Sequence, residues 1–309
     1  MRPGRRRRLA AHAAWIAFLL APPVALMAAF VAYPLASALA DAFYAWDGLR
    51  RGAFVGLRNF ADVLWREPFA PATWNAFAHN IEVLAGLAVI QNGGAFLLAW
   101  LLFREPWGHR FHRTALFLPV VLSDVIVAFL WKLFLNPNFG LVNAGLAGVG
   151  LAALARPWLG DPATALGALV LVSAWHWIGF PTLLFLAGMQ RIPREYIEAA
   201  RLDGMRERQV LRHVVWPLVA PSATIVFALL FIGAFNWFEL PYLMAGVDGS
   251  PFGHTDVLAL LFYRTAFGNQ SGANQDFGHG NAYAGLTFVF VGAVATLIVL
   301  AFRRREIAL

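Results

Sequence analysis

The sequence predicts an all-α membrane protein that crosses the bilayer six times and keeps both termini in the cytoplasm. Three observations predict this fold class: an apolar composition, six long apolar runs, and basic residues concentrated on one side of those runs. Of the 309 residues, 60% are apolar and only 13% are charged, and the mean hydropathy is +0.63. Soluble globular domains are less apolar and more highly charged. We therefore expect a polytopic membrane protein.

A transmembrane helix needs about 20 predominantly apolar residues, and six stretches of the chain meet this requirement. The first resembles a secretory signal because Arg5–Arg8 precede it, but its apolar run is longer and lacks a clear small-residue cleavage site. We expect it to be retained, so that residues 1–10 form a basic cytoplasmic N-terminus and residues 11–306 a transmembrane domain. The predicted spans are 11–39, 81–103, 115–135, 164–189, 221–244 and 283–302.

The basic residues predict the orientation of these spans. With the N-terminus inside, the cytoplasmic segments hold 17 of the 24 Lys and Arg residues and the opposite side holds 7. This asymmetry follows the positive-inside rule. The net charge of +7 therefore indicates membrane orientation, and we expect no nucleic acid partner. The chain has no cysteine, which excludes disulfides, thiol nucleophiles and cysteine-based metal sites.

A highly charged segment, residues 191–217, lies between the predicted fourth and fifth spans. It contains six arginines and four acidic residues. Pro193 suits the first turn of a helix, and Gly204 permits a left-handed turn at the end of that helix. A second helix is expected over about 206–216, where two prolines end it. A charged helical hairpin in an apolar protein is expected to contact a soluble partner.

Residues 198–204 read EAARLDG, and the two prolines follow at a fixed spacing. This pattern resembles the EAA loop of permease subunits of ATP-binding-cassette (ABC) importers, in the carbohydrate-uptake branch that includes maltose and glycerol-3-phosphate importers. The flanking stretch WHWIGFPTLLFLAGMQRIP and others extend the similarity over most of the chain. Met205 and Leu211 replace the residues usual in the family, Ala and Phe, but both stay apolar. The matching positions are Glu198, Ala199, Ala200, Asp203, Gly204, Pro217 and Pro221.

The resemblance implies the type I ABC-importer permease fold, a location in the bacterial cytoplasmic (inner) membrane, and coupling to a separate ATPase through this hairpin. The implied partners are a second, different permease, an ATPase dimer, and an extracytoplasmic solute-binding protein or lipoprotein. Because the chain lacks a GxxxxGK[ST] phosphate-binding motif, we expect no cofactor on it and place ATP and Mg²⁺ on the ATPase. The alternative is an amphipathic loop bound to lipid headgroups. The implied coupling residues are Glu198, Ala199, Ala200, Asp203, Gly204, Met205 and Leu211.

Polar side chains within the predicted spans suggest a path for a solute, because such groups usually face a cavity or a partner. At 1.5 Å per helical residue, Asp124 and His176 lie at a similar depth, about 16 Å into the bilayer. Neighbouring tryptophans can stack on a sugar ring, while the polar groups bond its hydroxyls. The candidates are Gln91, Asn92, Asp124, Trp175, His176, Trp177, Asn236, Trp237 and Glu239.

Several alternatives stay open from the sequence. Asp124 and His176 can instead pair with each other in helix packing, with the tryptophans anchoring the bundle. The EAA pattern indicates the energy source and not the cargo, so an importer of a non-sugar solute is also compatible with it. An ion-coupled carrier or an intramembrane enzyme that uses Asp124 and His176 is a further alternative. No spacing typical of a metal site is present, and we expect neither metal nor catalytic residues.

Overall fold

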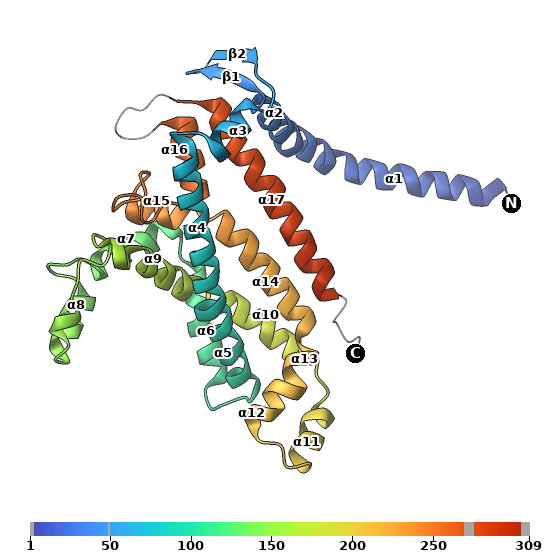
Figure 1. Cartoon of the computed structure of the whole chain (residues 1–309). Helices are drawn as coiled ribbons and strands as arrows, with labels where there is room; N and C mark the ends of the chain where they lie inside the picture. Colours follow the sequence, from blue (N-terminus) through green and yellow to red (C-terminus); the bar gives the residue numbers. More distant parts are fainter. Residues whose placement is uncertain (1–2, 49, 269–274, 304–309) are drawn as a thin grey trace.

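The computed structural model describes residues 3–48, 50–268 and 275–303, and most of this part of the chain is helical (Figure 1). One antiparallel hairpin of β1 (Tyr44–Asp47) and β2 (Arg50–Phe54) is present in this part of the chain. Three π-helical turns, η1 (Ala28–Ala32), η2 (Ala88–Gly93) and η5 (Leu211–Val215), and two 3-10 turns, η3 (Leu118–Val121) and η4 (Ala152–Leu154), interrupt or join the helices. The α-helices are α1 (Pro3–Met27), α2 (Tyr33–Asp41), α3 (Arg58–Trp65), α4 (Phe69–Leu87), α5 (Gly94–Phe103), α6 (His109–Phe117), α7 (Asp124–Phe134), α8 (Leu141–Gly148), α9 (Pro162–Trp177), α10 (Gly179–Met189), α11 (Arg194–Leu202), α12 (Glu207–Val210), α13 (Trp216–Leu218), α14 (Ala220–Phe235), α15 (Glu239–Ala245), α16 (Leu258–Phe267) and α17 (Phe277–Arg303).

Three helical segments are long and apolar enough to cross a membrane without a sharp bend: Trp15–Asp41, Phe69–Phe103 and Phe277–Phe302. Three further pairs of helices qualify only when each bent pair is counted as one span, which brings the total in the described chain to as many as six. The bent pairs are His109–Val121 with Asp124–Phe134 (98°), Pro162–Trp177 with Gly179–Met189 (48°), and Glu207–Leu218 with Ala220–Phe235 (75°).

The sharpest bend contradicts the continuous helix that we assumed when counting the depth of Asp124. Pro119 lies in the 3-10 turn η3, and Leu122 is in an extended conformation after it. The hydroxyl of Ser123 then accepts a hydrogen bond from the backbone N–H of Ile126 at 3.4 Å and caps the new helix α7. Asp124 is consequently the first residue of a helix and not part of the middle of one, because a proline turn and an N-cap divide the span.

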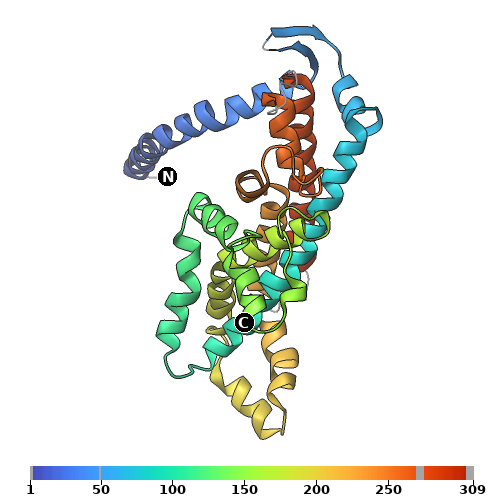
Figure 2. The same cartoon turned by 90° about the vertical axis from the view of Figure 1, so that its left-hand side faces the viewer.

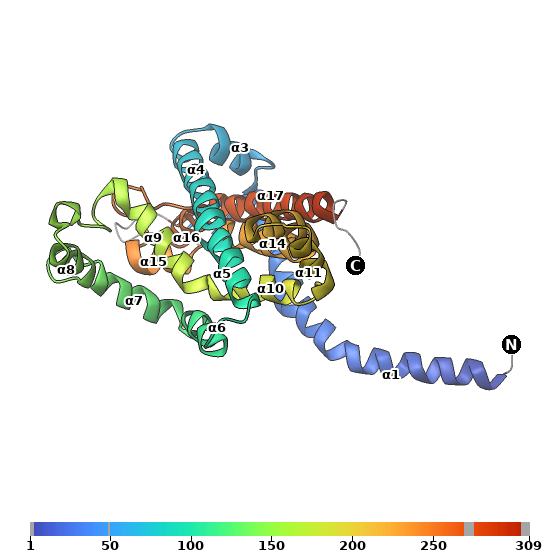
Figure 3. The ribbon, with the colours of Figure 1, turned by 90° about the horizontal axis from the view of Figure 1, so that it is seen from below.

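The helices pack around several apolar cores, and buried polar side chains join them. Asn80 is fully buried in α4, where its side-chain amide donates to the carbonyl of Ala234 in α14 (2.7 Å) and accepts from the N–H of Leu258 at the start of α16 (2.9 Å). Seen from below, α5 and α10 lie near the centre, α6 and α7 to one side, and α17 to another (Figure 3). In contrast, α1 projects away from the bundle (Figure 1). Within Trp15–Asp41, no residue of the most apolar 18-residue stretch is buried.

The charged hairpin forms one end of the molecule, opposite the β1–β2 hairpin (Figures 1 and 2). Its first helix, α11, begins directly after Pro193, and the second runs through α12, η5 and α13 to Leu218. Pro217 and Pro221 flank the 75° bend into α14. Buried Ile197, Ala200 and Val210 place the hairpin in the same apolar core as α5 and α10. The hairpin is thus packed against the bundle at its base.

Candidate functional site

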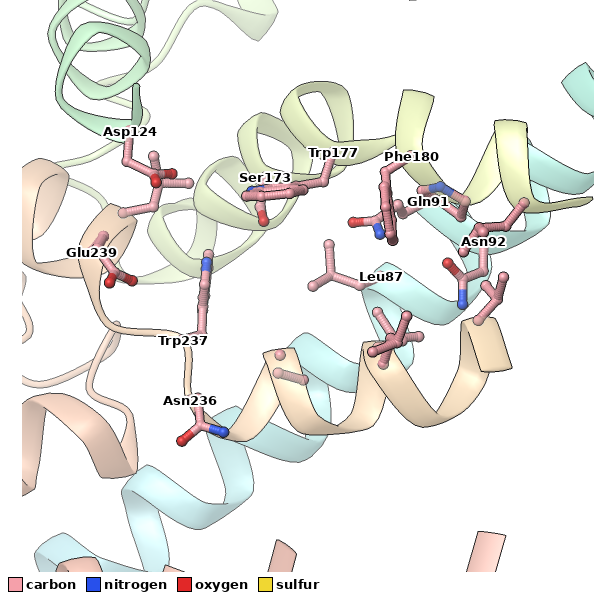
Figure 4. Close-up of a pocket in the computed structure, with 18 residues that line it drawn as sticks. Leu87, Gln91, Asn92, Asp124, Ser173, Trp177, Phe180, Asn236, Trp237 and Glu239 are labelled. Atoms are coloured by element: carbon pink, nitrogen blue, oxygen red, sulfur yellow. The ribbon is translucent and has the colours of Figure 1, made fainter. Parts of the chain in front are cut away.

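A cavity of about 370 Å³ lies where four interruptions of the apolar helices meet (Figure 4). The π-helical turn η2 contributes Gln91 and Asn92, and the bend before α7 contributes Asp124. The bend between α9 and α10 contributes Trp177 and Phe180, and the break after α14 contributes Asn236, Trp237 and Glu239. Because interrupted helices turn polar side chains and free backbone groups inward, a cavity at their meeting point is suited to binding a solute.

The polar groups of the cavity gather at separate places around an aromatic middle. Figure 4 shows Asp124 and Glu239 at one end and Asn92 at the other, with the rings of Trp177 and Trp237 between them. No lysine, arginine or histidine lines the cavity within the described chain. The lining is therefore suited to hydroxyl groups and apolar ring faces, and it carries negative charge at one end.

Asn92 stands out among the lining residues because its side chain is buried yet unpaired. Neither its amide nitrogen nor its carbonyl oxygen has a hydrogen-bond partner among the described residues. Leaving one buried polar atom unpaired costs about 1–3 kcal/mol, so this amide calls for a partner that the described chain does not supply, such as a solute or water. The wide π-helical turn is what directs Asn92 into the cavity, and such turns are frequent at functional sites.

His176 and Trp175, predicted as candidates, do not line this cavity. His176 is buried, with Nδ1 3.4 Å from a carboxylate oxygen of Asp124 and Nε2 3.1 Å from the carbonyl oxygen of Leu122. Since a carbonyl only accepts, Nε2 is the donor in the latter contact. His176 thus lies beside Asp124 in the helix packing, although its Nδ1 makes no hydrogen bond among the described residues. The ring of Trp175 packs edge-on against Trp131, 5.4 Å between centroids.

Seven of the nine predicted residues therefore come together in one cavity, and their role in transport stays a prediction. Sequence reasoning missed Ser173 and Phe180, which also line it. Ser173 lies one helical turn before Trp177 in α9, so the i, i+4 spacing of a polar and an aromatic residue was the available signal. Phe180 follows the bend itself, which no local pattern had indicated. The predicted residues that line the cavity are Gln91, Asn92, Asp124, Trp177, Asn236, Trp237 and Glu239.

The tip of the charged hairpin is a helix-ending glycine motif. The N–H of Met205 donates to the carbonyl of Ala200 and the N–H of Gly204 to that of Arg201, both at 3.0 Å. Gly204 itself has a φ of +79°. This is the Schellman arrangement, in which the residue after the helix adopts a left-handed conformation that only glycine takes without strain. The left-handed turn predicted at Gly204 is confirmed.

The predicted coupling residues divide between the surface and the interior. Glu198, Ala199, Asp203, Gly204 and Met205 are exposed at the tip. Ala200 is buried and Leu211 half-buried against the rest of the chain, so these two side chains hold the hairpin in place instead of presenting it to a partner.

Two further features of the tip emerge from the structure. Leu202 is 89% exposed, an apolar side chain that sequence reasoning did not select. An ion pair of 3.0 Å between Arg201 and Glu207 ties α11 to α12. The tip is thus a turn that an ion pair stabilises and that exposes an apolar side chain.

The described residues contain no group of three or more acidic or histidine side chains positioned to bind a metal ion.

Comparison with known proteins places these features in a family. The family model described as "Binding-protein-dependent transport system inner membrane component" matches residues 1–306. The chain is 32% identical to the probable ABC transporter permease protein YurN of Bacillus subtilis over 82% of this chain and 85% of that protein. It is 29% identical to the multiple sugar-binding transport system permease protein MsmF of Streptococcus mutans, over 95% and 97% of the two chains. A solved structure of a bacterial ABC transporter involved in alginate import has the same fold, with a TM-score of 0.76 at 22% identity over 97% of both chains.

Proposed function

This chain belongs to the family of inner-membrane components of binding-protein-dependent transport systems, and on that premise we propose that it carries a sugar or sugar-like solute. It does so with a second permease, across the bacterial cytoplasmic membrane. Membership in a family of ABC-importer permeases decides against the intramembrane enzyme considered from the sequence. Relatives named for starch degradation products, multiple sugars and diacetylchitobiose support the sugar assignment.

The cavity is the observation that carries the assignment. A sugar ring has apolar C–H faces and a rim of hydroxyls, and the cavity supplies indole rings in the middle with amides and carboxylates around them. The unpaired amide of Asn92 can both donate to and accept from a hydroxyl. The second permease supplies the rest of the path.

The same proposal gives the hairpin its role. The exposed tip around Gly204 docks on a separate ATPase, whose dimer holds ATP and Mg²⁺, while this chain binds no cofactor. Helix α10 provides the mechanical link: Phe180 and Leu184 line the cavity, and Phe185 and Met189 of the same helix pack in the core that contains Ile197 of α11. A movement of the hairpin therefore displaces a wall of the cavity.

Topology completes the proposal. Taking α14 alone as the span that follows the hairpin, and each of the other two bent pairs as one span, gives six crossings with both termini and the hairpin in the cytoplasm, in agreement with the excess of basic residues there. The β1–β2 hairpin then lies on the outer side, where a solute-binding protein or lipoprotein delivers the sugar.

Purification tests the whole assignment. Expressed with the neighbouring genes, the chain is expected to co-purify with a second permease and an ATPase, and the reconstituted complex to hydrolyse ATP faster when sugar-loaded binding protein is added. Solute accumulation by this chain alone, driven by an ion gradient, would establish a carrier and refute the proposal.

Two neighbouring tryptophans allow a matched test of whether the cavity binds the sugar. Trp175 and Trp177 are both 41% exposed on the same helix, but only Trp177 lines the cavity. Trp177→Ala is expected to lower sugar uptake by roughly 5–30-fold, equivalent to about 1–2 kcal/mol of lost stacking. Trp175→Ala is expected to change uptake by less than about two-fold, since its ring packs edge-on against Trp131 and does not line the cavity. Equal losses in the two variants, at equal amounts of complex in the membrane, would show that the cavity is not the path.

A further inference from the structure

A second cavity, which the proposed transport path does not use, lies between α5 and α6. Its volume is about 710 Å³. Leu98, Leu101 and Leu102 of α5 form one wall, and Ala115 and Leu116 of α6 form the other. It lies at the end of the molecule that carries the charged hairpin, because the turn 104–108 between the two helices is also at that end (Figure 2). We refer to it as the α5–α6 crevice.

The mouth of the crevice is basic. Arg104 and His112 both line it. Nε of Arg104 lies 4.0 Å from Oε2 of Glu207, while the other oxygen of that carboxylate, Oε1, accepts a 3.0 Å hydrogen bond from Arg201. At 4.0 Å this contact is an ion pair and not a hydrogen bond, so the guanidinium N–H donors of Arg104 can bind another anion.

The surroundings of the mouth add further positive charge. Exposed Arg110 lies on the same helix as His112, and Nε of Arg113 is buried without a partner among the described residues. The only acid in the turn, Glu105, faces Arg194 at 3.9 Å. The mouth consequently attracts anions.

Aromatic residues mark this mouth as a membrane boundary. Trp107 is 97% exposed and Phe111 is 73% exposed, although both are large and apolar. Aromatic rings flanked by arginines are typical of the headgroup level of a bilayer. From Arg104 to Leu98 the helix rises by about 9 Å, so the leucine wall extends from the headgroup level into the hydrocarbon.

We propose that the α5–α6 crevice binds an anionic phospholipid. The phosphate accepts hydrogen bonds from Arg104 and His112, and one acyl chain lies along the leucines of α5. The apolar walls favour a lipid over free phosphate, because free phosphate has no apolar group to pack against the leucines. The excess of positive charge at the mouth selects an anionic headgroup over a zwitterionic one. This assignment is independent of the cargo and of the docking partner of the hairpin.

Photolabelling of the assembled complex in lipid nanodiscs tests the proposal. Two probes carry the same photoreactive acyl chain, one on phosphatidylglycerol and the other on phosphatidylcholine, and the labelled peptides are mapped. Phosphatidylglycerol is expected to label residues 98–116 several-fold more strongly, and excess inorganic phosphate to leave the labelling unchanged. Neutralising Arg104→Gln is expected to reduce it by about five-fold, the equivalent of about 1 kcal/mol per basic residue at a membrane surface. Arg156→Gln, which removes an exposed arginine elsewhere, serves as the control and is expected to have no effect.

Three results would overturn the assignment. Equal labelling by the two probes would show an unselective lipid surface. Labelling abolished by inorganic phosphate would indicate a free-anion site. Labelling of this segment by neither probe would show that a protein subunit covers the crevice. A thermal unfolding curve of the Arg104→Gln complex that matches the parent confirms that reduced labelling does not reflect misfolding.

Discussion

Replacing Gly204 by Asp is expected to abolish ATP-driven uptake while leaving the chain folded and inserted in the membrane. Gly204 has a φ of +79° at the tip of the charged hairpin, where it ends α11. An L-residue in that conformation costs about 1–2 kcal/mol. That cost alone does not unfold a membrane domain of this size.

The effect is expected at the docking surface because nothing in this chain occupies the space beside Gly204. A Cβ built there meets no atom within 4 Å, so the aspartate side chain would project outward. On the proposed function the ATPase receives this tip, and a charged side chain would enter that contact. Loss of a central interface contact typically costs 2 kcal/mol or more, which weakens association by about 30-fold. The measurements are co-purification of the ATPase and uptake by cells with equal amounts of the chain.

Gly150→Asp provides the matched control. Gly150 is also exposed, has a φ of +82°, and has open space beside it, but it lies on the loop after α8, away from the charged hairpin. It therefore carries the same backbone strain and the same added charge without the proposed contact. Normal uptake with Gly204→Asp, or an equal defect with Gly150→Asp, would contradict docking through this turn.

The hairpin could be predicted from the sequence because its signals are local. Pro193 precedes the first helix, and Gly204 supplies the left-handed residue that ends it. Each acts through its own backbone conformation, with little dependence on the rest of the fold. The sequence did not show that Ala200 would turn inward, since that depends on the position of α5 and α10 behind it.

The cavity could be predicted in part. Polar residues in apolar runs were correctly expected to face a common space, because exposing them to lipid is costly. Which of them do so depends on the bends, and these arise from tertiary packing as well as from prolines. His176 does not line the cavity: Asp124 starts a new helix after a 98° bend, and its carboxylate lies beside the buried imidazole. Depth counted along a straight helix placed the two side chains at one level, but it did not show which of them faces the cavity.

Replacing Gly179 by Ala is expected to have the largest effect on stability. Gly179 is the first residue of α10, at the bend after α9, and it packs directly against the backbone of α6. A Cβ there would lie 2.3 Å from the carbonyl oxygen of Leu116 and 3.0 Å from the Cα of Phe117. A flexible side chain could move aside, but here the obstacle is main chain, so α6 or the bend itself must shift. Overpacking of this kind costs about 3 kcal/mol.

The consequence reaches the cavity, because α6 leads through η3 to Asp124 and the bend at Gly179 positions Trp177. Gly179→Ala is therefore expected to lower the thermal unfolding midpoint of the purified complex and to reduce uptake with it. Gly167→Ala is the control: the same substitution in α9, where a Cβ meets no atom within 4 Å, should gain up to about 1 kcal/mol in helix propensity. If the two variants unfold at the same temperature, the close approach of α6 to this bend does not hold the cavity together. If only Gly179→Ala loses both stability and uptake, the junction of the two bent spans is what maintains the site.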